Sequence, residues 1–84
     1  MHVEFLGIPR ERAGLSEVEI DAGTLGEALA VLAARFPALR ELMTAGGLHA
    51  SIAANLNGDE FVSDPHTALA DGDRLLLLSA DAGG

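Results

Sequence analysis

The stretch of sequence that decides the fold is "LADGDRLLLLSADAGG", residues 69–84. An Asp-Gly-Asp turn leads into four consecutive leucines, and a short acidic segment then ends in two glycines. Because successive residues of a strand point to opposite faces, Leu75 and Leu77 face one way and Leu76 and Leu78 face the other. A strand that is apolar on both sides needs cover on both sides. The last segment is therefore predicted to be a strand with two apolar faces.

Two further strands are predicted near the start of the chain. The segments "HVEFLG" (2–7) and "LSEVEID" (15–21) alternate apolar and polar residues. Between them, "IPRERAG" (8–14) supplies a proline, several charges and a glycine, which indicates a polar loop. Two alternating segments joined by such a loop predict a β-hairpin.

The segment "TLGEALAVLAARF" (24–36) predicts the main helix. Thr24 and Glu27 have the spacing of a capping box, in which each side chain accepts a hydrogen bond from the backbone at the other position. Apolar side chains recur at helical spacing and form one face: Leu25, Ala28, Leu29, Leu32 and Phe36. Pro37 ends this helix, and a short second helix is predicted over 37–43.

The segment "LHASIAANLNGDEFV" (48–62) predicts a strand, an Asn-Gly turn and a short extended return. One long helix can cover only one face of the resulting sheet. The chain offers no second layer for the other face, so part of the last strand is expected to leave an apolar patch in solvent, with Leu6 as its neighbour. Exposed apolar patches mark interaction sites. Leu6, Leu76 and Leu78 are therefore predicted to bind a partner.

Composition narrows the classes of function. A chain of 84 residues has room for one domain. Its formal net charge of −8 disfavours nucleic acid and anionic membranes and favours a basic protein partner. It contains no cysteine, which excludes disulfides and thiolate metal sites and suits a reducing, cytoplasmic location. The start lacks the basic segment of a secretory signal, and the longest apolar run is too short to span a bilayer.

No group of side chains has a catalytic pattern. The three histidines lie far apart with no acid at ligand spacing, so no metal site is expected. No glycine-rich turn opens a helix after a strand, so no nucleotide site is expected. The remaining group is the terminal carboxylate, an oxygen nucleophile that can attack the α-phosphate of ATP in another protein's pocket. The product is an activated acyl-adenylate, from which a sulfur nucleophile can displace AMP. Gly83 and Gly84 lack side chains and Ala82 has a small one, which suits a tail that threads a narrow channel.

The "LADGDRLLLLSADAGG" ending, the helical segment "TLGEALAVLAARFPALRELM" (24–43) and the hairpin "ANLNGDEFV" (54–62) together resemble the MoaD/ThiS family of ubiquitin-like sulfur carriers. The resemblance covers essentially the whole chain. It implies an α+β, β-grasp (ubiquitin-like) fold, in which one main helix packs on one face of a mixed sheet and the last strand runs parallel to the first in mid-sheet. It also implies a single domain over 1–80 and a flexible C-terminal tail over 81–84.

The resemblance implies the chemistry of the tail as well. A ubiquitin-activating-like adenylyltransferase uses ATP to adenylate Gly84, whose carboxylate becomes a thiocarboxylate, while this chain itself binds no cofactor. The length suits the small subunit of molybdopterin synthase in molybdenum cofactor biosynthesis. In that enzyme the large subunit receives the tail and supplies the catalytic side chains, so this chain has none of its own.

This chain departs from the family pattern just before the tail. Family members commonly have prolines and an apolar residue where this chain has Ser79, Ala80 and Asp81. An acidic residue at this point implies a different partner pocket, and Asp81 is therefore grouped with the partner-binding residues.

Three other functions stay open. The same sulfur-carrier chemistry could serve another pathway: thiamine thiazole, cysteine, a sulfur-containing natural product or thiolated tRNA. The tail could instead form amide bonds to lysines, as in a ubiquitin-like conjugation module. The third is a small acidic adaptor with an accidental Gly-Gly end, which would keep its binding after loss of Gly84, whereas any carrier would lose its activity.

Overall fold

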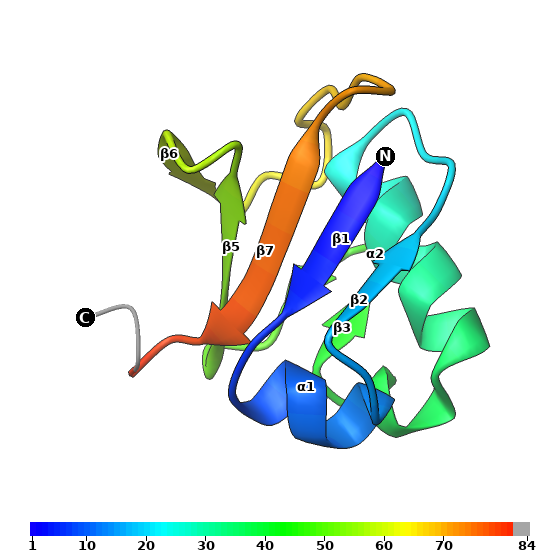
Figure 1. Ribbon diagram of the computed structural model, residues 1–84, viewed down its shortest axis with the longest axis vertical. Coiled ribbons are helices and arrows are strands. Elements are labelled where there is room, and N and C mark those ends of the chain that lie inside the picture. The colour runs from blue at the N-terminus through cyan, green and yellow to red at the C-terminus, as the bar shows by residue number, and fades with distance from the viewer. Residues whose placement is uncertain (82–84) are drawn as a thin grey trace.

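The leucine-rich strand lies in the middle of the sheet. The computed structural model describes residues 1–81 of the chain (Figure 1). In it, β7 (Arg74–Ser79) runs parallel to β1 (His2–Phe5) on one side and antiparallel to β5 (Ile52–Leu56) on the other. The outer strands are β2 (Glu17–Glu19), beside β1, and β6 (Glu60–Val62), beside β5. The expected mixed sheet, with its last strand parallel to its first, is confirmed.

The segment between the first two strands is a helix and not the predicted loop. This helix, α1 (Ile8–Ala13), has a proline in its first turn, where no N–H is needed for a hydrogen bond within the helix. It ends at Gly14, whose φ of 79° and N–H bond to the Arg10 carbonyl (3.0 Å) close the last turn. Proline and glycine occur in loops and also at the ends of helices, and here Pro9 and Gly14 mark the two ends of α1. The flanking strands still pair antiparallel, as the hairpin prediction requires.

The main helix, α2 (Leu25–Arg35), crosses one face of the sheet (Figure 1). Its predicted N-terminal cap is present, because Thr24 Oγ1 accepts a hydrogen bond from the Glu27 N–H at 3.2 Å. The return bond differs from the prediction: the Glu27 carboxylate accepts from the N–H of Gly23 at 2.8 Å, one residue before the cap. Four residues of the predicted apolar face are fully buried: Leu25, Ala28, Leu29 and Leu32. Phe36 is half-buried, and its ring meets that of Phe5 edge-on with centroids 5.8 Å apart.

The predicted second helix is reduced to one turn of 3-10 helix, Pro37–Leu39. A small hairpin follows it, in which β3 (Met43–Thr44) pairs with β4 (Gly47–Leu48). Met43 is 1% exposed, so its burial against α2 holds this segment extended where the helix was expected to continue. The next long strand, β5, consequently starts at Ile52 and not at the predicted residue 48.

The hydrophobic core lies between α2 and the sheet face that α2 covers. Leu75 and Leu77 of β7 are both 0% exposed and point into this core, as does Val3 of β1. The predicted assignment of these two leucines to the covered face is thus confirmed. Among residues 1–81, no helix combines the length and the apolar character needed to cross a membrane.

Candidate functional site

The face of the sheet turned away from α2, here called the outer face, is described by the strand registers. One row of paired residues crosses it from β2 to β6: Glu17, Glu4, Leu76, Asn55 and Phe61. Residues that pair directly lie on the same face of a sheet, so this row is acidic over β2 and β1 and apolar over β7 and β6. The outer face therefore has an acidic half and an apolar half.

The apolar half consists of Leu6, Leu76, Leu78 and Phe61. Leu6 is 45% exposed and Leu76 is half-buried, so these two form the expected patch in solvent. Leu78 is only 6% exposed, which contradicts its predicted exposure. The reason is its place in the central strand: Ala53 lies opposite it on β5, and Leu6 extends β1 on its other side, with the Leu6 N–H bonded to the Leu77 carbonyl at 2.9 Å. The role of these residues in partner binding stays a prediction.

Phe61 is an outer-face residue that the sequence analysis did not single out. It is 61% exposed on the edge strand β6, and a hollow of about 430 Å³ opens beside it, between the β5–β6 hairpin and the segment over 46–50 that contains β4. The sequence signal was a phenylalanine in the short return strand, out of phase with the buried positions. An exposed aromatic side chain beside a hollow is typical of an interaction surface.

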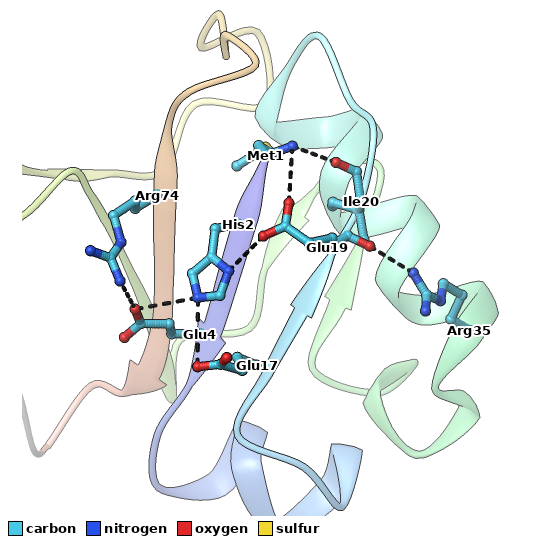
Figure 2. Close-up of polar contacts among 8 residues, drawn as sticks. All are labelled: Met1, His2, Glu4, Glu17, Glu19, Ile20, Arg35 and Arg74. Carbon is cyan, nitrogen blue, oxygen red and sulfur yellow. Dashed lines mark hydrogen bonds and ion pairs between the residues drawn. The ribbon is translucent and has the colours of Figure 1, made fainter.

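The acidic half is organised around His2 (Figure 2). The His2 ring lies 2.7 Å from a Glu19 carboxylate oxygen, 3.5 Å from Glu4 and 3.7 Å from Glu17. Arg74 of β7 reaches across to Glu4 with a guanidinium–carboxylate distance of 2.6 Å. Two basic side chains thus sit among three carboxylates, and carboxylate charge remains exposed over β1 and β2.

Strand β2 is held on both sides beside this acidic half. On the inner side, the α-ammonium group of Met1 donates a hydrogen bond to the Ile20 carbonyl at 2.6 Å, lies 3.8 Å from the Glu19 carboxylate, and extends the pairing of β1 with β2. On the outer side, the Glu19 carbonyl lies at the edge of the sheet. Arg35 of α2 donates to the Glu19 carbonyl at 3.0 Å (Figure 2). A carbonyl at a sheet edge that is bonded in this way is less available to a strand of another chain. Pairing with another strand is therefore disfavoured at this edge.

The predicted tail begins where β7 ends. Asp81, the first residue of the predicted tail, is exposed. The other three predicted tail residues, Ala82, Gly83 and Gly84, lie outside the described residues. Leu6 and Leu78 form the row of the outer face closest to Asp81, so the apolar half adjoins the point where the chain leaves the sheet.

The Asp-Gly-Asp turn at the opposite end of β7 is tied to the β5–β6 turn. Asp73 accepts hydrogen bonds from the Asn57 side-chain amide at 3.0 Å and from the Ala70 N–H at 2.8 Å. Asn57 in turn accepts from the N–H of Arg74 at 2.8 Å. These bonds lower the pKa of Asp73, with the Asn57 amide as the largest cause and the Ala70 N–H next. This tie is structural, since it lies at the far end of the strand from the tail.

The remaining titratable side chains suggest no second site. The pKa of Asp64 is lowered, chiefly by the hydrogen bond from the His66 backbone N–H, in an exposed turn. In the part of the chain that the structure describes, no group of three or more histidine and acidic side chains is placed to hold a metal ion. The outer face and the adjoining chain end are therefore the candidate site.

Solved structures of other proteins share the fold of this chain. Among solved structures, SAMP1 from Haloferax volcanii is 32% identical, with 100% of this chain and 98% of that chain covered and a TM-score of 0.75. A chain of the BexX/CysO complex from Amycolatopsis orientalis is 30% identical over 99% of this chain and 98% of that one, with a TM-score of 0.79. A Pyrococcus furiosus protein described as molybdopterin converting factor, subunit 1, is 23% identical over 93% of each chain, with a TM-score of 0.73, which is a likeness of fold alone. No curated protein matches.

The family assignment comes from the sequence match. The chain matches the ThiS family over residues 3–84, which includes both terminal glycines. The β-grasp topology and the structural neighbours agree with that match. The chain therefore belongs to the ThiS family, among the ubiquitin-like sulfur carriers of the MoaD/ThiS type.

Proposed function

We propose that this protein carries sulfur as a thiocarboxylate on Gly84 and hands it to an acceptor enzyme. The observation that carries the proposal is the family match over residues 3–84, which extends to the two glycines at the end of the chain. The described domain supports the proposal with an exposed apolar patch near Asp81, and within residues 1–81 no group of three or more histidine and acidic side chains is placed to hold a metal ion.

The proposed chemistry needs a partner at each step. In the pocket of an adenylyltransferase, a carboxylate oxygen of Gly84 attacks the α-phosphorus of ATP, and the bond to pyrophosphate breaks. Hydrosulfide from the sulfur donor then attacks the acyl carbon, AMP leaves with one of the former carboxylate oxygens, and loss of the S–H proton gives the thiocarboxylate. The contribution of this chain is the nucleophile and a tail without bulky side chains, and the partner supplies the nucleotide site.

The outer face supports the proposal as the docking surface. Leu6 and Phe61 are among the most exposed apolar side chains described, and the carboxylates of Glu4 and Glu17 lie in the same face. Such a surface fits a partner with an apolar centre and a basic rim over the acidic half. The net charge of −8 would speed the encounter with that partner through long-range attraction.

The sulfur acceptor is the finer part of the proposal. The length of the chain favours the large subunit of molybdopterin synthase as the acceptor, with this chain as the small subunit, although Ser79, Ala80 and Asp81 depart from the pattern of that family. A second candidate is an acceptor in another sulfur pathway, favoured because the neighbour from the BexX/CysO complex shares more sequence than the neighbour described as a molybdopterin converting factor, 30% against 23%.

The test uses the full chain, the adenylyltransferase encoded in the same genome, ATP and a sulfur donor. We expect the chain to support exchange of pyrophosphate into ATP and then to gain the mass of one sulfur in place of one oxygen on the peptide that ends in Gly84. Deletion of Gly84 should abolish both. Gly83→Leu should fold normally and lose most of the exchange, since its side chain would obstruct a narrow channel.

Gly72→Ala is the matched control, because a Cβ at Gly72 meets no atom within 4 Å and its φ needs no glycine. It should be processed like the wild type. Amide-linked adducts between Gly84 and lysines of other proteins, with no sulfur gain, would instead establish a conjugation module. Full activity after deletion of Gly84 would refute the carrier proposal.

A further inference from the structure

The end of β7 is held by a side chain as well as by the sheet. Ser79 is the last residue of the strand, and its hydroxyl oxygen accepts a hydrogen bond from the backbone N–H of Ile8 at 2.8 Å. Ile8 is the first residue of α1, which packs against β7 (Figure 1). The bond joins residues that are 71 positions apart, and it is partly buried. One side of the strand end is thus fastened to α1.

Gly7 makes this close approach possible. Its φ is 64°, a backbone conformation that side chains disfavour. A Cβ at this position would lie 2.3 Å from the Ser79 hydroxyl oxygen and 3.2 Å from the Ser79 Cβ. Any residue larger than glycine would therefore push the Ser79 hydroxyl away from the N–H of Ile8.

The other side of the strand end is fastened to the loop before β5. The N–H of Ala80 donates to the Ser51 carbonyl at 2.8 Å. Ser51 is held in turn by His49, whose Nδ1 lies 2.9 Å from the Ser51 hydroxyl oxygen and accepts from the Ser51 N–H at 3.0 Å. Ser79 is therefore held from the side of α1 and Ala80 from the side of β5, and Asp81, the last residue that the structure describes, is exposed.

We propose that Ser79 is a positioning residue that helps to hold the chain at Ala80, the last residue with a backbone hydrogen bond to the domain within residues 1–81, and so sets how far the tail can reach. This inference rests on the proposed function. The four residues after Ala80 span at most about 14 Å when fully extended, at roughly 3.3–3.6 Å per residue. The carboxylate of Gly84 can enter a partner's pocket to that depth while the outer face stays docked. Release of residues 79 and 80 would lengthen the tail and add conformational entropy, which would be lost again when the tail enters the partner's pocket.

The first test measures amide hydrogen exchange in Ser79→Ala and Gly7→Ala, with the exposed Ser63→Ala as the matched serine control. Loss of the hydroxyl should speed exchange of the Ile8 amide by about tenfold, since a net hydrogen bond is lost. The decisive amide is that of Ala80, which bonds to Ser51 on the other side of the strand. We expect it to exchange about tenfold faster as well, in both variants but not in the control.

Unchanged exchange of the Ala80 amide in Ser79→Ala would overturn the inference, because the hydroxyl would then only cap α1. Gly7→Ala reaches the same bond with Ser79 intact, so agreement between the two variants excludes an effect of the serine substitution alone. Ser79→Ala removes one oxygen and adds no bulk, so it keeps the test valid if Gly7→Ala does not fold.

The second test measures adenylation kinetics with the adenylyltransferase of the same genome. Ser79→Ala should lower kcat by about tenfold. The backbone of about one released residue must be ordered again before the carboxylate reacts, and the conformational entropy lost in that step reduces the rate by roughly this factor. The KM for the carrier should stay unchanged, because the outer face is intact. A changed KM with an unchanged kcat would contradict a positioning role. If the wild-type chain is not adenylated at all, the proposed function fails, whereas the hydrogen-exchange result still decides whether Ser79 holds the strand end.

Discussion

Truncation of two neighbouring leucines in β7 provides a sharp test of the face assignment. Leu77 is 0% exposed, and its partners in the sheet are Phe5 on one side and Ala54 on the other. Leu76 precedes it on the same strand but points to the outer face and is half-buried. Leu77→Ala and Leu76→Ala remove the same atoms from adjacent positions, so only the environment of the side chain differs.

The expected losses of unfolding free energy differ severalfold. Leu77→Ala leaves a cavity in the core and should cost about 3–5 kcal/mol. Leu76→Ala leaves no enclosed cavity and loses roughly half of a leucine's burial, about 1 kcal/mol. A chain of this size has a total stability of roughly 4–13 kcal/mol. Leu77→Ala should therefore lower the Tm by roughly 15 °C or more.

Urea unfolding followed by far-ultraviolet circular dichroism measures both losses. The chain contains no tryptophan and no tyrosine, so intrinsic fluorescence is a poor probe. The slope of free energy against urea must match between the two variants for the comparison to hold. Equal losses, or a larger loss for Leu76→Ala, would show that the outer face is not the exposed one. In an assay of binding to the adenylyltransferase the order should reverse, with Leu76→Ala binding more weakly than its loss of stability explains.

Three further substitutions test the elements around the site. In a solvent-exposed helix, Gly26→Ala would stabilise the protein by about 1 kcal/mol. Here the added Cβ would lie 2.7 Å from the Ala45 carbonyl oxygen, so we expect the free energy of unfolding to fall by about 1–3 kcal/mol, measured by thermal unfolding. A rise in Tm would contradict that packing. Thr24→Ala removes the cap of α2 and should cost about 1 kcal/mol in the same assay, whereas no change would mean that the cap is dispensable. The lowered pKa of Asp73 means that its contribution to stability is complete at neutral pH and is lost as the pH falls from the ordinary value near 3.9 through the lower folded value. The difference in Tm between wild type and Asp73→Asn should therefore be largest at pH 7 and vanish in strong acid, and a difference that persists at low pH would assign the effect to something other than ionisation.

Local patterns predicted most of the elements. Alternation located β1 and β2, a run of four leucines located β7, and the spacing of apolar residues located α2. The Asn57–Gly58 pair has φ values of 58° and 73°, as a tight turn requires. Each of these depends on neighbouring residues only. The loop predicted over 8–14 became α1 because the same proline and glycine can serve either structure, and packing against β7 selects the helix.

The candidate site was predicted in part. Leu6 and Leu76 are on the outer face as expected, but Leu78 is buried and Phe61 was not singled out. The exposure of a leucine in a central strand depends on which strands lie beside it. The pattern of neighbouring residues does not predict the order of the strands, because β1 and β7 pair across about 70 positions of sequence.

By itself, the sequence determined the strands, the main helix and the end of the chain that bears the glycines, since these follow from the chemistry of adjacent residues. Only the tertiary structure decided the order of the strands, the acidic and apolar halves of the outer face, and the fastening of Ser79 to Ile8. These features join residues far apart in the chain. Their geometry is set by how the sheet and helices pack, because a hydrogen bond or a buried contact forms only where packing brings both partners together.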